Sequence, residues 1–504
     1  MKTNKTPENL QLVIFGGTGN LSRSKLFPSL YSLFRRGKLP ENLTLLGLGR
    51  RYSNESEYLN ALSRKAKNVL SNYSKEIWQE FSRDISYQRF DFRSQDCYRN
   101  LRKKLKKADD SSASLTSNLI FYLAAAPQHF GTITEFLAKY GLLKSEEESW
   151  PRVVFEKPFG YDLDSAVRYN NQVRNFVPEE NIYRIDHYLG KQMIQNIFVI
   201  RFANALFEPV WNRNHIDNIQ IISTEKSGVK KRGRYYDEAG AMRDMMQSHL
   251  LQMLAMVTME PPVDMTPECI RREKIKIFKS LASPNPENIE NELVLGQYVS
   301  GSIEEKSVQS YQDEPDIRKD SLTETFAALK LQIDSLRWQD VPFYLKTGKR
   351  LGEKRAEIIV EFEPSFHPAL EKNLNPDNSN ILRMTVQPKE GVSLQFNAKK
   401  PGKKHKTVPV NMDFCQNCKK NFNSPAAYEE IFTGLFRGDQ SLFTHWQEIK
   451  HSWQFIDSVK KSAEQADIPI ISYDAGTRGP IEADRLLEKD GRVWWDEVKS
   501  YENI

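Results

Sequence analysis

The chain has 504 residues, of which 39% are hydrophobic and 27% are charged, a composition typical of a soluble globular protein with more than one domain. It contains no run of 18 or more apolar residues, and its polar start does not resemble a signal peptide, so we expect a cytoplasmic protein without a membrane partner. Four cysteines are too few for a disulfide framework in a chain of this length.

The net charge of +6 is small for a nucleic-acid-binding protein, and the basic clusters are scattered along the chain. Such clusters are more often solvated helix faces and loops, and a mild positive bias also suits small anionic ligands. We therefore predict no nucleic-acid partner, while nucleic-acid binding stays the second functional class to be tested.

The first part of the chain alternates apolar runs with helical patterns. Residues 12–15 form an apolar run that ends at a glycine-rich turn, and 21–36 has apolar residues at helical spacing. Further strands are predicted at 43–48, 119–124 and 152–155, and helices at 57–70 and 130–140. This alternation predicts an α/β Rossmann domain with a doubly wound parallel sheet over residues 1–185.

The glycine-rich turn has the spacing of a dinucleotide-binding loop. Gly17-x-Gly19-x-x-Ser22 lies directly after a predicted strand and directly before a predicted helix. Glycines let the backbone turn sharply and approach a pyrophosphate, whose charge the helix N-terminus favours. The spacing alone is weak, but its context supports a nicotinamide cofactor bound by Gly16, Gly17, Thr18, Gly19, Asn20 and Leu21.

The end of the second predicted strand distinguishes NADP from NAD. An NAD enzyme needs a carboxylate there for the ribose 2′-hydroxyl, whereas an NADP enzyme needs arginine for the 2′-phosphate. Here Arg50 and Arg51 follow Gly49, and no acidic residue occurs before Glu55. We therefore predict NADP and a solvated position for Arg51, and the family resemblance given below implies that Arg50 is the 2′-phosphate ligand.

The segment 182–191 concentrates polar chemistry in a few positions. A short apolar run ends at Ile185, and Asp186, His187, Tyr188 and Lys191 follow. If a helix begins here, His187 and Lys191 are four apart and share a face, which makes a good pocket for a phosphate. From chemistry alone, an ordinary polar surface helix is an equally good interpretation.

The pattern changes after about residue 185. A long helix is predicted at 242–259, strands at 218–223, 343–345, 357–362 and 381–386, and exposed loops at 283–291 and 373–380. We expect a larger α+β domain with a mostly antiparallel sheet over residues 186–504. His249 lies among apolar residues of the long helix, and in isolation it would be read as a core histidine.

One cysteine pair has the spacing of metal ligands. Cys415-x-x-Cys418 could supply two ligands, but a structural zinc site needs four, and no second pair follows at the usual spacing. We predict no metal site.

Several motifs together resemble the glucose-6-phosphate 1-dehydrogenase family. The segment 186–191 is similar to the family's active-site signature, although Gln192 replaces the usual Glu, and the glycine turn is similar except that Asn20 replaces Asp. The other matching motifs are Lys25–Leu30, Glu156–Gly160, Asp237–Gly240, Arg243–Leu254, Pro342–Lys349 and Tyr473–Pro480. They follow the family's order from about residue 11 to residue 495.

The resemblance implies an activity, the oxidation of D-glucose 6-phosphate at C1 to 6-phospho-D-glucono-1,5-lactone with hydride transfer to NADP+. This is the first step of the oxidative pentose phosphate pathway. It implies that His249 is the general base, oriented by Asp186, and that Lys157 contacts both sugar and cofactor with a cis Lys157–Pro158 bond. The implied substrate ligands are His187, Tyr188 and Lys191 for the 6-phosphate, with Glu225, Asp244, Lys349 and Lys354 for the sugar or its phosphate.

The resemblance also bears on assembly. It implies a homodimer or homotetramer formed through the C-terminal domain. A second, structural NADP is expected to be missing, because Thr385, Ser393 and Gln395 replace the Arg, Tyr and Lys of animal relatives. A dehydrogenase for a different sugar or for NAD, and a paralogue without turnover, are the remaining alternatives.

Overall fold

We describe a computed structural model of the protein, covering residues 6–108, 117–144, 149–364, 379–403, 407–415 and 426–495. Within it the chain divides into two compact units. The first comprises Met1–Lys191, Asp264–Arg271 and Pro425–Lys450, and the second Gln192–Val263, Arg272–Ser424 and His451–Ile504. Among the helices of the described chain, none combines the length and the hydrophobicity that a membrane span requires.

Seven strands form the sheet of the first unit within the described residues, in the order β17-β6-β5-β4-β1-β2-β3. Apart from the short β17, which pairs antiparallel with β6, neighbouring strands run parallel. The order from β3 to β6 is that of a Rossmann fold. The strands are β1 (Asn9–Phe15), β2 (Asn42–Gly49), β3 (Ile85–Arg89), β4 (Asn118–Leu123), β5 (Pro151–Phe155), β6 (Ile182–Ile185) and β17 (Phe443–Thr444).

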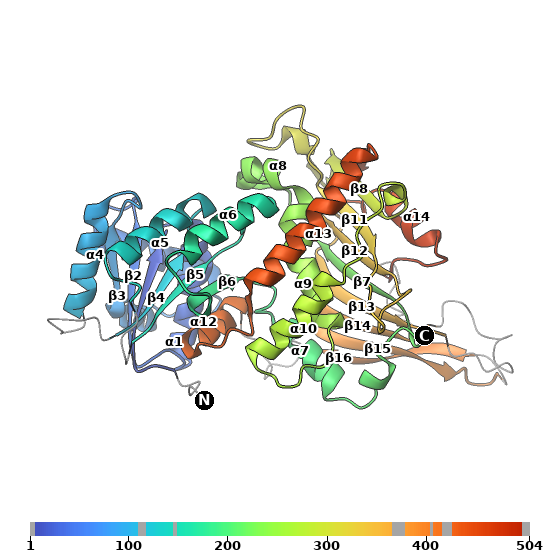
Figure 1. Ribbon diagram of the computed structural model, residues 1–504, viewed down its shortest axis with the longest axis horizontal. Coiled ribbons are helices and arrows are strands. Elements are labelled where there is room, and N and C mark those ends of the chain that lie inside the picture. The colour runs from blue at the N-terminus through green and yellow to red at the C-terminus, as the bar shows by residue number, and fades with distance from the viewer. Residues whose placement is uncertain are drawn as a thin grey trace. The chain divides into compact units, whose positions relative to one another are not determined.

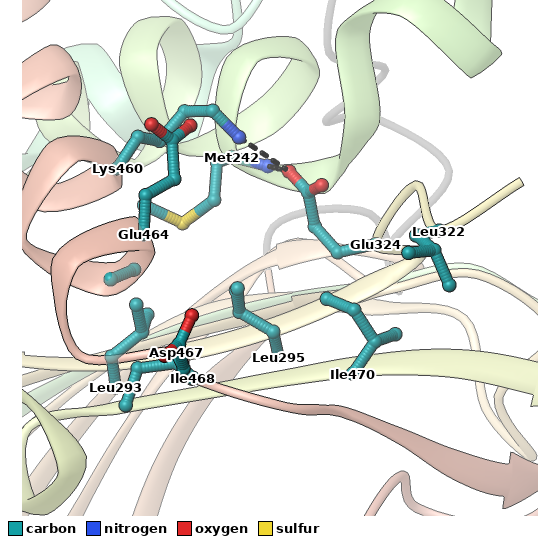
Figure 2. A pocket seen from close by; sticks show the side chains of 11 residues that line it. Met242, Leu293, Leu295, Leu322, Glu324, Lys460, Glu464, Asp467, Ile468 and Ile470 are labelled. Atoms are coloured by element: carbon teal, nitrogen blue, oxygen red, sulfur yellow. Dashed lines mark hydrogen bonds and ion pairs between the residues drawn. The ribbon is translucent and has the colours of Figure 1, made fainter.

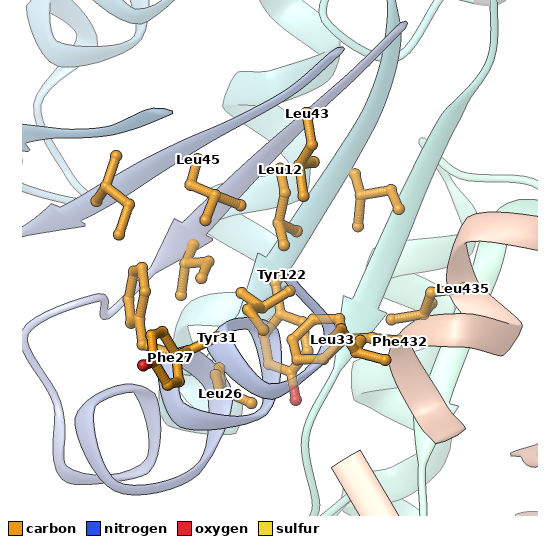
Figure 3. Close-up of a cluster of buried hydrophobic side chains, with 14 of the residues drawn as sticks. Leu12, Leu26, Phe27, Tyr31, Leu33, Leu43, Leu45, Tyr122, Phe432 and Leu435 are labelled. Atoms are coloured by element: carbon orange, nitrogen blue, oxygen red, sulfur yellow. The ribbon is translucent and has the colours of Figure 1, made fainter. Parts of the chain in front are cut away.

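Helices cover both faces of this sheet, so its inner strands are buried on both sides and read as continuous apolar runs (Figure 1). One face packs against α1 (Phe27–Arg35), α2 (Glu55–Val69), α3 (Lys75–Phe81) and α12 (Ala427–Arg437). The other packs against α4 (Gln95–Ala108), α5 (Phe130–Lys139) and α6 (Leu163–Arg174). Figure 3 shows the first of these two cores, where Leu12 and Tyr122 of the sheet meet Leu26 and Phe432.

The second unit is built on a larger, mostly antiparallel sheet. Counting only the described chain, it has nine strands in the order β16-β15-β14-β13-β7-β12-β11-β8-β18, with parallel pairs at β7/β12 and β8/β18. These are β7 (Ile216–Thr224), β8 (Leu293–Val299), β11 (Phe326–Leu331), β12 (Phe343–Gly348), β13 (Arg355–Phe362), β14 (Ile381–Gln387), β15 (Gly391–Lys399), β16 (Thr407–Cys415) and β18 (Ile470–Asp474). A separate hairpin joins β9 (Gly301–Ile303) to β10 (Lys306–Val308).

The helices of the second unit include the one predicted to carry His249. It consists of a π-helical segment, η7 (Met242–Leu250), that continues as α9 (Leu251–Thr258), and every residue of α9 is buried. Among the described residues, the other α-helices are α7 (Gln192–Phe202), α8 (Gly233–Ala241), α10 (Pro267–Lys279), α13 (Trp446–Gln465) and α14 (Glu482–Glu488). Of these, α10 and α13 have their first residues in the first unit.

The predicted fold class is confirmed: a parallel Rossmann sheet is followed by a larger α+β part with a mostly antiparallel sheet. Two short segments, Asp264–Arg271 and Pro425–Lys450, pack with the first unit although they follow residue 185 in the chain. Most of the predicted loop at 373–380 lies outside the described residues.

Candidate active site

The glycine turn after β1 is held by close backbone contacts. Gly16 has φ +79°, and a Cβ atom there would lie 2.3 Å from the carbonyl oxygen of Ala124, so only glycine fits. The Ser22 hydroxyl donates to the Gly16 carbonyl at 2.9 Å, and the Gly19 N–H donates to the same carbonyl at 2.8 Å. The turn therefore leads into the helical residues from 22 onward in the way that a dinucleotide-binding loop does.

A cavity of about 660 Å³ opens beside this turn, at the carboxyl ends of the parallel strands. That edge of an open α/β sheet is where such folds bind their ligands. Both Arg50 and Arg51 are exposed and both line the cavity, so the geometry does not single out Arg50. The lining residues are Gly16, Thr18, Gly19, Gly49, Arg50, Arg51, Phe90, Asp91, Phe92, Arg93, Ala124 and His129.

Sequence reasoning missed four of the residues that line this cavity: Asp91, Phe92, Arg93 and His129. The His129 ring meets the Phe92 ring edge-on at 5.5 Å between centroids. Burial lowers the pKa of His129, and the positive charges of Arg93 and Arg50 lower it further. A signal was available, because Asp91 to Arg93 follow β3 and His129 follows β4, at the edge where ligands bind.

Lys157 follows the next strand, β5. The Lys157–Pro158 peptide bond is cis, as expected. Lys157 and the residue before it, Glu156, are both partly buried. A cation is therefore placed two residues beyond the end of β5, on the same unit as the dinucleotide-type turn.

The segment after β6 corrects one prediction. Residues 187–191 do not begin a helix: they form turns, and α7 starts only at Gln192. The N–H groups of Leu189 and Lys191 donate to the carbonyls three residues earlier, of Asp186 and Tyr188, at 3.1 and 3.0 Å. The prediction that a helix places His187 and Lys191 on one face was therefore wrong.

The turns nevertheless bring the predicted phosphate ligands together. The Lys191 ammonium lies 4.1 Å from the centre of the Tyr188 ring, and the His187 ring meets the Tyr188 ring at 5.0 Å. Asp186 is only 3% exposed, and its Oδ1 accepts the Tyr188 N–H at 2.9 Å. A buried carboxylate thus anchors a turn that carries an imidazole, a phenol and an ammonium, a donor set suited to a phosphate.

In the second unit, His249 and Asp244 lie on η7 and are 1% and 4% exposed. Asp244 accepts from the Tyr235 hydroxyl at 3.2 Å and lies 3.7 Å from the Arg232 guanidinium. His249 and Asp186 belong to different units, so the predicted base and its orienting carboxylate come from separate parts of the fold.

The start of η7 is fixed by Glu324. Its Oε1 accepts the Met242 N–H at 3.2 Å and lies 3.9 Å from the Lys460 ammonium (Figure 2). These groups line a cavity of about 370 Å³, which apolar side chains such as Leu295 and Ile470 also line. Gly240, two residues earlier, has φ +68° and ψ 179°, and a Cβ atom there would lie 2.3 Å from the same Oε1. This explains the glycine of the Asp237–Gly240 motif as a backbone requirement at the entrance to the helix that carries His249.

The remaining sugar-ligand candidates lie beside β7 and β12. The Lys349 ammonium lies 2.6 Å from Glu225 Oε2 and 4.9 Å from the centre of the Tyr236 ring. The Tyr473 hydroxyl donates to the Lys349 carbonyl at 2.7 Å, which gives the C-terminal motif a supporting role. Lys354 is exposed just before β13.

The cysteine pair is described only in part. Cys415, at the end of β16, is disulfide-bonded, so its sulfur is not available as a thiolate ligand, and Cys418 lies outside the described residues. Cys97 and Cys269 are free thiols.

Comparison with known proteins agrees with this arrangement over nearly the whole chain. Residues 13–196 match the family profile for the glucose-6-phosphate dehydrogenase NAD binding domain, and 198–495 match the profile for its C-terminal domain. The glucose-6-phosphate 1-dehydrogenase of Bacillus subtilis is 42% identical over 98% of this chain and 100% of its own length, and that of Aggregatibacter actinomycetemcomitans is 40% identical over 97% of each. A solved glucose-6-phosphate dehydrogenase in complex with its substrate glucose-6-phosphate superposes with a TM-score of 0.88 at 31% identity, covering 98% of this chain and 100% of that one.

Proposed function

The chain belongs to the glucose-6-phosphate dehydrogenase family, and from this we propose that it oxidises D-glucose 6-phosphate at C1 to 6-phospho-D-glucono-1,5-lactone, with hydride transfer to NADP+. The observation that carries the proposal is the match of both halves of the chain to relatives of this name, in unbroken order. In a cell this reaction would open the oxidative pentose phosphate pathway, in the cytoplasm.

The reaction needs a base for the C1 hydroxyl proton, and His249 takes this role in the proposal. An imidazole is suited to it because its charge changes near neutral pH. The burial of His249 and the fixed start of its helix support a preorganised base. Asp186 orients the imidazole and stabilises the imidazolium that forms when the proton is taken, the part that aspartate plays in a Ser-His-Asp triad.

The substrate is held at its two ends. His187, Tyr188 and Lys191 bind the 6-phosphate, which is supported by their close packing on one turn. The sugar hydroxyls or the phosphate are bound by Glu225, Asp244, Lys349 and Lys354. Lys157 contacts both the sugar and the cofactor. The ion pair between Glu225 and Lys349 offers one acceptor and one donor for neighbouring hydroxyls.

The cavity beside the glycine turn would hold NADP, which supplies the hydride acceptor when it is bound. Its pyrophosphate would be held by the turn residues Gly16, Gly17, Thr18, Gly19, Asn20 and Leu21. Arg50 pairs with the 2′-phosphate, and the proximity of Arg93 and His129 to Arg50 supports an anionic group at this end of the cavity. The donor set fits a phosphate-bearing ribose better than a free diol, because no carboxylate follows β2 directly.

We also propose that the protein assembles as a homodimer, or as a tetramer of such dimers, through β15 and β16. The register pairs Val392 with Phe414, Leu394 with Met412, and Phe396 with Val410, so these six apolar side chains share one face of the sheet edge. Phe396, Met412 and Phe414 are 37%, 62% and 51% exposed. Exposed apolar edge strands favour association, and a second copy of this chain is the occupant that the family implies.

The activity is tested by following NADPH formation with purified protein. Glucose 6-phosphate should be oxidised with a much higher kcat/KM than glucose or galactose 6-phosphate. If another sugar phosphate or NAD were preferred, the substrate or cofactor assignment would fail while the family assignment would stand. Retention on a DNA matrix at moderate salt would revive the nucleic-acid alternative.

A further inference from the structure

Glu156 is a carboxylate beside Lys157 to which the proposed reaction gives no role. It lies between the end of β5 and the cis Lys157–Pro158 bond, and it is partly buried. Two phenol hydroxyls donate to its Oε1, that of Tyr122 at 2.5 Å and that of Tyr428 at 3.1 Å. One carboxylate oxygen therefore ties three separate segments of the first unit together: β4, β5 and α12.

Both tyrosines are held firmly. Tyr122 is fully buried in the core that Figure 3 shows, where its ring lies 6.0 Å from that of Phe432. Tyr428 is in the first turn of α12, and the next residue, Glu429, pairs with Arg36 of the segment after α1. The orientation of the Glu156 carboxylate is thus fixed from two sides.

The charged groups that act on the pKa of Glu156 are Lys157, its neighbour in the chain, and Asp186, after β6, beside the hydrogen bonds from Tyr122 and Tyr428. Burial raises the pKa of Glu156 to about 7, and Asp186 also raises it, while both tyrosine bonds and Lys157 act in the opposite direction. Because the folded-state pKa lies close to neutrality, the charge beside Lys157 changes over the ordinary working range of an enzyme.

We propose that Glu156 is a positioning residue for the reaction: its carboxylate, clamped by Tyr122 and Tyr428, holds the Lys157 ammonium in place and adds negative charge beside Asp186. This rests on the proposed function, because it is there that Lys157 contacts the sugar and Asp186 orients the base. In the ionised form Glu156 compensates the Lys157 charge and favours the imidazolium that Asp186 stabilises. When Glu156 takes up a proton, both effects are lost.

The test compares the wild type with Glu156→Gln as a function of pH. Glutamine keeps the size and one acceptor oxygen but mimics the protonated carboxyl, so the two proteins should have similar kcat/KM at about pH 5.5 and differ about tenfold at about pH 8.5. The ratio of the wild-type kcat/KM to that of Glu156→Gln should therefore rise with increasing pH, with a midpoint near pH 7.

Tyr428→Phe supplies an independent readout and a safeguard if Glu156→Gln does not fold. It removes a bond that favours the ionised form, so the pH midpoint attributed to Glu156 should move upward. Tyr73→Phe is the matched control, because it removes a partly buried phenol hydroxyl that bonds to Ser63 instead of Glu156, and it should leave the midpoint where it is in the wild type.

A wild-type to Glu156→Gln ratio that is the same at every pH, or a Tyr428→Phe midpoint that does not move, would overturn the inference and leave Glu156 as a structural residue. The absence of glucose 6-phosphate oxidation in the wild type would instead overturn the proposed function. An infrared titration of the protonated carboxyl band of Glu156 in the ligand-free protein distinguishes failure of the inference from failure of the proposed function. A band that titrates near neutrality and disappears in Glu156→Gln supports the inference without turnover, and its absence from the wild type contradicts it.

Discussion

If the proposed preference for NADP rests on Arg50, Arg50→Ala should leave a protein that discriminates poorly between NADP+ and NAD+. Each charge-assisted hydrogen bond contributes about 1.5–3 kcal/mol, and a guanidinium can make two with one phosphate. Two such bonds would contribute about 3–6 kcal/mol without screening, but Arg50 is exposed and water screens them, so we expect a loss of about 2–3 kcal/mol. At 1.4 kcal/mol per factor of ten this is a loss of roughly 30- to 150-fold in kcat/KM for NADP+.

NAD+ has a hydroxyl in place of the 2′-phosphate, so its kcat/KM should change by no more than a few-fold. The assay measures kcat/KM for both cofactors at saturating glucose 6-phosphate. Arg51→Ala is the matched control, since Arg51 is also exposed and lines the same cavity. A smaller effect is expected there because the proposed function assigns the 2′-phosphate to Arg50. An equal loss with NAD+ and NADP+ in Arg50→Ala would refute the reasoning and assign Arg50 to the fold or to the adenine.

Three further changes test other parts of the account. Lys191→Ala should raise the KM for glucose 6-phosphate more than about tenfold, because it removes a charge-assisted phosphate bond, and an equal rise with unphosphorylated glucose would contradict the assignment. Gly240→Ala should lower the free energy of unfolding by about 1–3 kcal/mol or more, measured by denaturant titration, because alanine is strained at φ +68° and its Cβ would meet Glu324. Met412→Glu should shift the protein toward the monomer in analytical ultracentrifugation, and an unchanged mass would remove β16 from the interface.

The fold could be predicted from the sequence because its signals are local. The apolar run before Gly16 and the helical spacing after it specify a strand, a turn and a helix whatever the rest of the chain does. The return of Pro425–Lys450 to the first unit has no such signal, because it depends on contacts such as that between Tyr428 and Glu156, 272 positions apart in the chain.

The candidate site was predicted unevenly for a similar reason. Residues within one motif, such as Tyr188 and Lys191, could be predicted to lie close together, but the sequence analysis expected a helix at these positions. The structure has turns there, and a Cβ atom on Gly190 would lie 2.6 Å from the carbonyl oxygen of Ala427. Arg93 and His129 belong to no motif, and only the edge of the sheet brings them to the cavity.

The central claim, that His249 is the base of a glucose 6-phosphate dehydrogenase, is tested most directly by His249→Asn. The measurement is kcat for glucose 6-phosphate oxidation together with the dissociation constants of glucose 6-phosphate and NADP+. We predict a kcat at least about 10²-fold below the wild type, the usual contribution of a positioned base, with both dissociation constants nearly unchanged. A kcat within about threefold of the wild type would contradict the account, because such a small loss is too little for a general base.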